Sequence, residues 1–156
     1  METVGLGLYY EDLTLGRKFK TVGRTVTDAD ITLFVGVTGM TEVLFTDAEF
    51  LKSTSLFAGR PAPGALIYSL AEGLLVQSTM QHTGLAFLHM ELEMKGPVLA
   101  GETIHVECEV IEARLSNSKP GRGLVRTRNN VVKHNGDIAL VYTPLRMIKR
   151  RPPAPH

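Results

Sequence analysis

The most continuous run of apolar residues in the chain lies between Pro61 and Met80. After Pro63, which suits the first turn of a helix, apolar side chains occupy nearly every side of several successive turns rather than a single stripe. Such a helix has to be buried. About 20 residues at 1.5 Å each make a rod of roughly 30 Å, which strands of about ten residues can cover along its length. The pattern therefore predicts a central helix wrapped by a sheet.

The hydrophobic period changes to two in the second half of the chain. Apolar and polar residues alternate over 88–94 and again over 103–110, which predicts strands with one apolar face. The segment His134–Asp137 contains the Asn-Gly pair typical of a tight hairpin, so 124–132 and 138–148 are predicted to be antiparallel neighbours. The last of these strands is apolar on both faces, which indicates a partly covered outer face, most simply by a second copy of the chain.

Shorter elements are predicted ahead of the central helix. Residues 18–26 are rich in Val, Thr and Phe and predict a strand. Thr27 is a helix N-cap followed by an acidic first turn and an apolar stripe, and Gly39 ends that helix. Residues 38–50 are expected to be mostly loop, with Asp47 capping a brief second helix. Loops held by such a scaffold are common places for chemistry.

These elements together indicate an α+β protein, with an antiparallel sheet packed on one long helix. A length of 156 residues with 44% hydrophobic content fits one domain, which we assign to residues 1–149. Residues 150–156 are proline-rich, offer nothing to bury, and are predicted to form a flexible tail.

Charge and cysteine content narrow the class of protein. Seventeen Lys and Arg against sixteen Asp and Glu leave a formal net charge of +1, which gives no general attraction to nucleic acid or to anionic membranes. The single cysteine, Cys108, excludes an internal disulfide, and the first residues lack the pattern of a secretion signal. We expect a cytoplasmic protein. No metal-ligand spacing is present, so no metal is predicted.

Several segments of the sequence, in order, resemble the MaoC-like hydratase/dehydratase family. They are Gly23–Ile31, Thr38–Gly39, Thr46–Phe50, Gly64–Leu66 with Gly73–Leu74, and Gly96–Ile104. The resemblance runs over nearly the whole chain from Tyr9 to Ile148. It implies the hotdog fold, a sheet curled around a central helix and usually paired as a dimer. It also implies acyl-CoA thioesters as ligands, with CoA as part of the substrate rather than a separate cofactor, and (R)-specific hydration of enoyl-CoA or its reversal as the chemistry.

One segment departs from the family pattern. Family hydratases carry an Asp and a His in a segment of the form Gly-Asp-x-Asn-Pro-x-His-x-Asp. Aligned through Gly39 and Asp47, this chain has Met40 in place of the Asp and Phe45 in place of the His. Neither side chain can transfer a proton, whereas hydration of an enoyl thioester needs a base for water and an acid for the α-carbon.

Three other residues are candidates to replace the missing groups. Glu42 is the only carboxylate in the displaced segment ahead of Asp47, although an exposed loop glutamate is the commoner case. Glu72 lies on the central helix, where an unpaired buried carboxylate costs several kcal/mol, so it either acts in chemistry, reaches water, or pairs with an arginine such as Arg60. His89 aligns with the family glycine whose amide polarises the thioester carbonyl, and it lies on the polar side of its strand.

We further expect five residues to contact the substrate. Met40 and Phe45 occupy the positions of the family's acid and base, Gly64 begins the central helix, and Arg126 and Arg128 share a strand face from which they can bind CoA phosphates. A solvated strand face is at least as common for such arginines.

Three functions remain open from the sequence. The first is a hydratase/dehydratase homologue with relocated acid and base. The second is an acyl-CoA thioesterase, since the same fold supports hydrolysis by a carboxylate-activated water, and the fold alone does not decide. The third is a non-catalytic acyl-CoA-binding or partner subunit, which Met40 and Phe45 favour.

Overall fold

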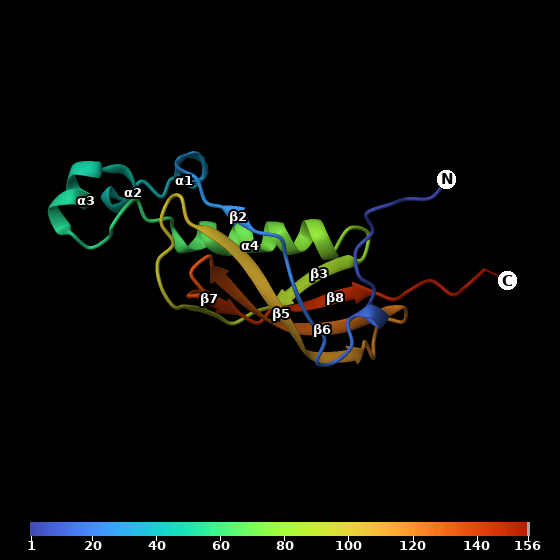
Figure 1. Cartoon of the computed structure of the whole chain (residues 1–156). Helices are drawn as coiled ribbons and strands as arrows, with labels where there is room; N and C mark the ends of the chain where they lie inside the picture. The colour runs from blue at the N-terminus through green and yellow to red at the C-terminus, as the bar shows by residue number, and fades with distance from the viewer. Residues whose placement is uncertain (156) are drawn as a thin grey trace.

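A computed structural model describes residues 1–155 and shows an eight-stranded antiparallel sheet wrapped around helix α4 (Figure 1). The fold class predicted from the sequence is therefore confirmed. The elements in chain order are η1 (Tyr10–Asp12), β1 (Lys18–Lys20), β2 (Arg24–Thr25), α1 (Asp28–Thr38), α2 (Val43–Thr46), α3 (Ala48–Thr54), α4 (Gly64–Thr79), β3 (Gly84–His89), β4 (Leu92–Met94), β5 (Thr103–Leu115), β6 (Arg122–Lys133), β7 (Ile138–Tyr142) and β8 (Leu145–Lys149).

The long strands β5 and β6 form the centre of the sheet. The strand order is β1-β5-β6-β7-β4, with β2 also paired to β5, β8 paired to β6, and β3 paired to β8. Strands β7 and β8 pair with successive parts of β6, and Thr143 and Pro144 separate them. Strands β3 and β4 are likewise two halves of the sheet edge, separated by Met90 and Glu91. The predicted Asn-Gly hairpin is present, with Gly136 at a positive φ of 92°.

Three strands predicted as continuous are interrupted in the structure. The predicted strand over 138–148 is broken at Thr143 and Pro144, because proline has no backbone N–H to donate to a sheet. The predicted strand over 88–94 is broken at 90–91, and the predicted strand over 18–26 consists of β1 and β2. Alternation of apolar residues does not report such breaks, since it continues across them.

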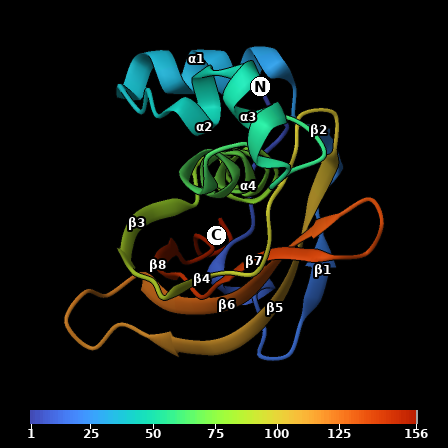
Figure 2. The same ribbon diagram turned by 90° about the vertical axis from the view of Figure 1, so that its left-hand side faces the viewer.

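Helices α1, α2 and α3 form a layer on the side of α4 away from the sheet (Figure 2). Helix α1 has the predicted N-cap, with the Asp30 amide donating to the Thr27 hydroxyl and the Asp30 carboxylate accepting from the Thr27 amide. It ends at Gly39, whose φ is 74°. Asp47 caps α3 as predicted. The single turn α2 lies in the segment expected to be loop.

The core lies between α4 and the concave face of the sheet. Helix α4 is buried through Leu66, Ile67, Ala71, Leu74 and Leu75, which pack in one cluster with buried side chains of β5, β6 and β7. These are the apolar positions that predicted a buried central helix. Within residues 1–155 no helix has the length and apolar character needed to cross a membrane.

The two chain ends lie at the same end of the molecule (Figure 1). Arg150 and Arg151 begin the segment predicted to be a flexible tail. In the structure Arg150 donates to the Glu11 carboxylate at 2.9 Å, and Arg151 pairs with Asp12 at 2.6 Å. These ion pairs connect the residues after β8 to η1. The last residue of the predicted tail lies outside the described residues.

Candidate functional site

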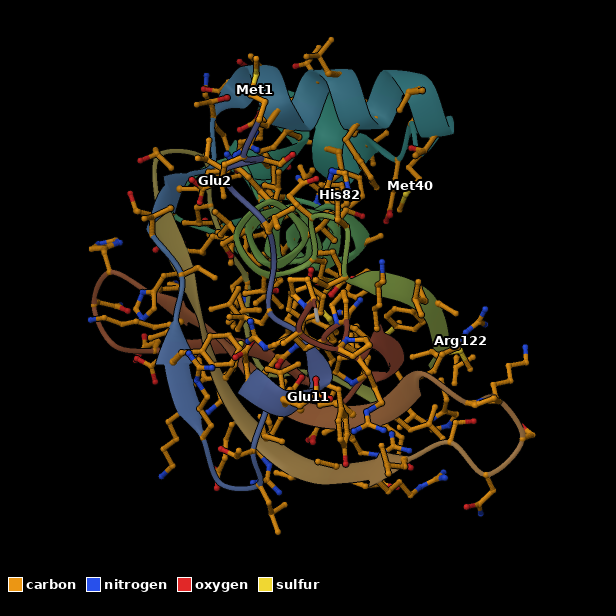
Figure 3. All side chains as sticks on the ribbon, turned by 90° about the vertical axis from the view of Figure 1, so that its right-hand side faces the viewer. Met1, Glu2, Glu11, Met40, His82 and Arg122 are labelled. Carbon is orange, nitrogen blue, oxygen red and sulfur yellow. The ribbon has the colours of Figure 1, made fainter. Side chains whose placement is uncertain are left out.

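Residues 39–47, the segment that departs from the family pattern, connect α1 to α3 near the start of α4. Figure 3 shows Met40 beside the end of α1, in the layer of helices, with Glu11 on the sheet side of α4. Glu42 precedes α2, and its exposed side chain makes no hydrogen bond within residues 1–155. Arg60 fixes this segment, because its guanidinium donates to the Phe45 carbonyl at 3.0 and 3.1 Å and to the Thr32 hydroxyl at 2.9 Å.

Phe45 faces a hollow that we call the apolar hollow. It has a volume of about 410 Å³ and lies between α2, the start of α4 and the segment after β4. Only one of its lining residues, Lys95, carries a charge. The lining residues are Leu44, Phe45, Phe57, Pro61, Ala62, Gly64, Ile67, Met94, Lys95, Gly96, Pro97 and Val98. A hollow of this size and character suits an acyl group better than a charged one.

A second hollow, which we call the polar hollow, lies on the other side of Phe45 and Phe57. Its volume is about 510 Å³. Its lining residues are Asp28, Phe45, Thr46, Asp47, Ala48, Leu51, Lys52, Phe57, Ala58, Gly59 and Arg60. The two hollows share Phe45 and Phe57 as a common wall beside α2. The polar hollow differs from the apolar one in having two carboxylates and two cations in its lining.

The N-terminus of α4 opens at the apolar hollow through Gly64. The residue before it is Pro63, which provides no side-chain cap, and the first hydrogen bonds to the Pro63 carbonyl come from Leu66 and Ile67. The amides of Gly64 and Ala65 are therefore not satisfied by a cap. A helix N-terminus carries a partial positive charge and is suited to stabilise a negative oxygen in the hollow.

Glu72 lies in the middle of α4 and is held by two partners. Its carboxylate accepts a hydrogen bond from the Tyr142 hydroxyl at 2.7 Å and forms an ion pair with Arg146. Burial, followed by the charge of Glu72, raises the pKa of Tyr142 well above its usual value, which keeps its hydroxyl protonated as the donor. The pairing with an arginine anticipated from the sequence is present, although the partner is Arg146 rather than Arg60.

His89 lies at the end of β3 next to Arg126. The Arg126 guanidinium is 3.3 Å from His89 Nδ1 and also donates to the Thr143 carbonyl at 2.9 Å. Because arginine can only donate, Nδ1 accepts, and the neutral ring carries its hydrogen on Nε2. His89 in this state can donate a hydrogen bond from Nε2.

The two arginines expected to bind CoA phosphates are paired with carboxylates in the sheet. Arg126 contacts Glu112 at 3.2 Å, and Arg128 lies 3.8 Å from Glu109. Both ion pairs join β6 to β5. Neither arginine lines the apolar or the polar hollow. Their binding of CoA remains a prediction.

The structure brings together only some of the residues predicted for the site. Phe45 and Gly64 line the same hollow, whereas Met40, Glu42 and Glu72 line neither hollow, and His89 lies in a separate network with Arg126. Sequence reasoning missed the roles of Tyr142 and Arg146. The available signal was Arg146, a lone arginine inside the otherwise apolar strand at 145–148. A buried carboxylate elsewhere in the chain would require such an arginine as its partner.

Comparison with known proteins agrees with this architecture. The model of the MaoC like domain matches residues 12–134. The chain belongs to the MaoC-like family. The match includes the segment with Met40 and Phe45, the start of α4 and the hairpin of β5 and β6. A search of curated proteins found no match.

Solved structures of similar proteins have the same fold. The monoamine oxidase regulatory protein of Archaeoglobus fulgidus is 28% identical over 94% of this chain and 97% of its own, with a TM-score of 0.80. A MaoC-like dehydratase from Rhodospirillum rubrum is also 28% identical, over 94% of this chain and 99% of its own, with a TM-score of 0.79. The (R)-hydratase PhaJ1 of Pseudomonas aeruginosa, 24% identical over 96% and 97%, shares the fold with a TM-score of 0.77. This MaoC-like chain therefore has the hotdog fold predicted for it.

Proposed function

We propose that this MaoC-like protein binds acyl-CoA thioesters and catalyses the reversible hydration of 2-enoyl thioesters. The observation that carries the proposal is the apolar hollow of about 410 Å³ at the uncapped N-terminus of α4. In the adjoining polar hollow, Lys52 and Arg60 are the cations available to the phosphate-bearing part of CoA. Asp28 and Asp47 line the same hollow, and Lys52 is also paired with Glu49. The similar structures include a MaoC-like dehydratase and an (R)-hydratase, which supports the same reaction class.

The α4 N-terminus and Glu42 have separate roles in the proposed reaction. Addition of water places hydroxyl on the β-carbon and moves negative charge onto the thioester oxygen. The amides of Gly64 and Ala65 stabilise that charge. Glu42, the only carboxylate of the displaced segment ahead of Asp47, is the proposed acid/base group. Because it is exposed and lines neither hollow, the segment that carries it has to turn inward before Glu42 can take a proton from water and return one to the α-carbon. Glu72 does not serve here, because Tyr142 and Arg146 already occupy its carboxylate.

The first test is incubation of the protein with enoyl-CoA and 3-hydroxyacyl-CoA esters. We expect loss or gain of the conjugated thioester without release of free thiol. Glu42→Gln should lower kcat about a hundredfold or more, since it removes the acid/base group. Glu2→Gln is the matched control, because Glu2 is an exposed carboxylate near the first residue and lines neither hollow.

The other outcomes have defined meanings. Release of free thiol would show a thioesterase, and unchanged turnover in Glu42→Gln would exclude Glu42 as the base.

A second candidate, an acyl-CoA-binding protein without catalysis, is favoured by Met40 and Phe45 and by the engagement of Glu72 and His89 in other contacts. It would be supported by ligand-induced stabilisation without turnover.

We also propose that two copies of the chain pair along strand β3. All six residues of β3 are exposed, and Leu85, Phe87 and Leu88 are between 43% and 48% accessible. The strand pairs only with β8, so within residues 1–155 the other edge of its backbone has no partner. An exposed apolar edge strand is a site for strand pairing with another chain, and pairing with a second copy would give a homodimer.

A further inference from the structure

Helix α1 has apolar residues on two opposite sides. Ile31 and Val35 are buried and pack in the core. On the other side, Leu33, Val37 and Met40 recur after four and three residues, so they lie in one row along the helix. Two small residues belong to the same row. We call its five members the α1 stripe, namely Ala29, Leu33, Gly36, Val37 and Met40.

The α1 stripe faces away from the rest of the protein. Leu33, Val37 and Met40 are 72%, 84% and 38% exposed. Figure 2 shows α1 at the outer edge of the helix layer, with α4 and the sheet on its inner side. A surface helix of a globular protein carries polar residues opposite its buried face. Single exposed apolar residues are ordinary, but a continuous row of them marks an interaction surface.

Negative charge lies at both ends of the α1 stripe. Asp28 and Asp30 are in the first turn of α1. Asp30 pairs with Arg24 at 2.9 Å, whereas Asp28 is 76% exposed and lies 3.5 Å from Arg60. At the other end, the last turn of α1 has no basic residue, and a helix C-terminus carries a partial negative charge. The exposed carboxylate of Glu42 follows the stripe.

These charges disfavour two possible occupants of the α1 stripe. Two copies of the chain joined stripe to stripe would bring acidic ends together, whether the helices ran parallel or antiparallel, and like charges across an interface oppose association. An anionic lipid surface would be repelled for the same reason. Over residues 24–60, five carboxylates against three cations leave a net charge of −2, although the whole chain carries +1. The complementary partner is basic as well as apolar.

We propose that the α1 stripe is the docking surface for a partner protein that presents a basic amphipathic helix. The apolar face of that helix covers Leu33 and Val37, and its flanking Lys or Arg residues meet the carboxylates at the two ends of the stripe. Helices recognise such a row through anchors spaced by three and four residues. The inference goes beyond the proposed function, since neither binding nor hydration of a thioester requires this surface.

The docking surface reaches the candidate site. Met40 belongs both to the α1 stripe and to residues 39–47, the segment that carries Glu42. This segment contains one helical turn, in which the Phe45 amide donates to the Glu42 carbonyl at 2.9 Å. Segments with few buried contacts open readily, and a docked partner reduces such opening. Amide hydrogen exchange from Leu33 to the start of α2 should therefore slow when the surface is occupied.

The test uses a synthetic amphipathic helix of about 18 residues, with Leu on one face and Lys on the other, as a fluorescent probe. One comparison peptide has Glu in place of Lys, and another has the same composition in an order without an apolar face. We expect fluorescence anisotropy to show binding of the first peptide alone, with a Kd that rises as salt is raised from about 0.05 to 0.3 M. Failure of that peptide to bind, or equal binding of either comparison peptide, would overturn the inference.

Paired variants locate the binding. Leu33→Gln with Val37→Gln should raise the Kd of the basic peptide at least about tenfold, because two apolar contacts are lost. The matched control is Leu15→Gln with Val22→Gln, which changes the same residue types at positions that are 71% and 76% exposed and lie outside α1. All four positions are exposed, so both proteins should keep the Tm of the unaltered protein. Equal changes of Kd in the two double variants would contradict the proposed location.

Two further measurements distinguish the occupants. On binding of the basic peptide, protection from hydrogen exchange should centre on residues 33–43, and protection confined to other residues would overturn the inference. If Leu33→Gln with Val37→Gln lowered the mass measured by light scattering, a second copy of the chain would be the occupant instead. If the unaltered protein bound phosphatidylglycerol vesicles and this variant did not, the surface would belong to a membrane and not to a partner protein.

Discussion

Glu72 shows how a carboxylate is kept inside the core of this protein. Its side chain is 16% exposed, and its two partners, Tyr142 and Arg146, come from β7 and β8, so helix and sheet are joined by one charged contact. A buried pair of this kind contributes little net stability compared with apolar residues of similar volume. Removing one partner alone, however, strongly lowers the free energy of unfolding.

This asymmetry gives a prediction at the scale of the residue. Glu72→Met leaves the Arg146 charge buried without its partner and should lower the free energy of unfolding by about 3 to 5 kcal/mol. The double variant Glu72→Met with Arg146→Met should recover most of that loss, because no buried charge is left. Urea denaturation of the two single variants and the double variant measures the coupling as a double-mutant cycle. Independent, additive effects would contradict the pairing.

Cys108 is a second residue whose chemistry follows from burial. Desolvation raises the pKa of its thiol to about 12, and the side chain lies on the concave face of β5. A protonated, buried thiol is a poor nucleophile. Cys108 therefore belongs to the core rather than to the site.

At the scale of the element, Glu102 connects the turn before β5 to the end of β6. Its carboxylate accepts from the Leu99 amide at 2.8 Å and pairs with Lys133 at 2.9 Å. Burial alone would raise the pKa of Glu102, but the hydrogen bonds from Leu99 and Lys133 and the charge of Lys133 outweigh it and lower the pKa below the ordinary value of 4.5.

The sign of the pH dependence follows. Because the folded-state pKa is lowered, the stabilisation from Glu102 is fully present above pH 4.5 and is lost as the pH falls through the lower folded-state value. Glu102→Gln should therefore destabilise the protein at pH 7 and have a smaller effect at pH 3. Urea titrations of both proteins at the two pH values test this. An equal loss of stability at both would show that the ionised carboxylate has no special role.

The elements also differ in how far the sequence could predict them. Helix α1 and the start of α3 were predicted because their caps lie within three residues of the groups they satisfy. The partner of Glu72 was not predicted, since Arg146 is 74 residues away and only the packing of α4 on the sheet brings the two residues together. The hollows were not predicted for the same reason, because α2, α4 and the segment after β4 line them jointly. Family resemblance indicated which loop to expect there, and the exposed loop position that the sequence favoured for Glu42 is present.

At the scale of the whole molecule, the exposed β3 edge leads to the dimer proposed above. Light scattering during gel filtration should give the mass of two chains. Leu88→Lys should shift that mass toward one chain, because a charge within a strand pairing that excludes water is left without water or a partner. Leu115→Lys is the matched control, since Leu115 is 47% exposed at the end of β5 and lies away from β3. A monomeric mass for the unaltered protein would contradict the dimer, and an equal effect of both variants would contradict its location.

The pairing of β1 with β5 has a consequence for how the protein is made. Lys18 lies opposite Glu109, about 90 residues later in the chain. At a synthesis rate of about 5 to 20 residues per second, β1 emerges from the ribosome roughly 5 to 18 s before its partner strand exists. Through that interval the N-terminal strands have no sheet to join, and α4 has none from the time it emerges. The nascent chain is thus most exposed to chaperones and proteases just before β5 and β6 are complete.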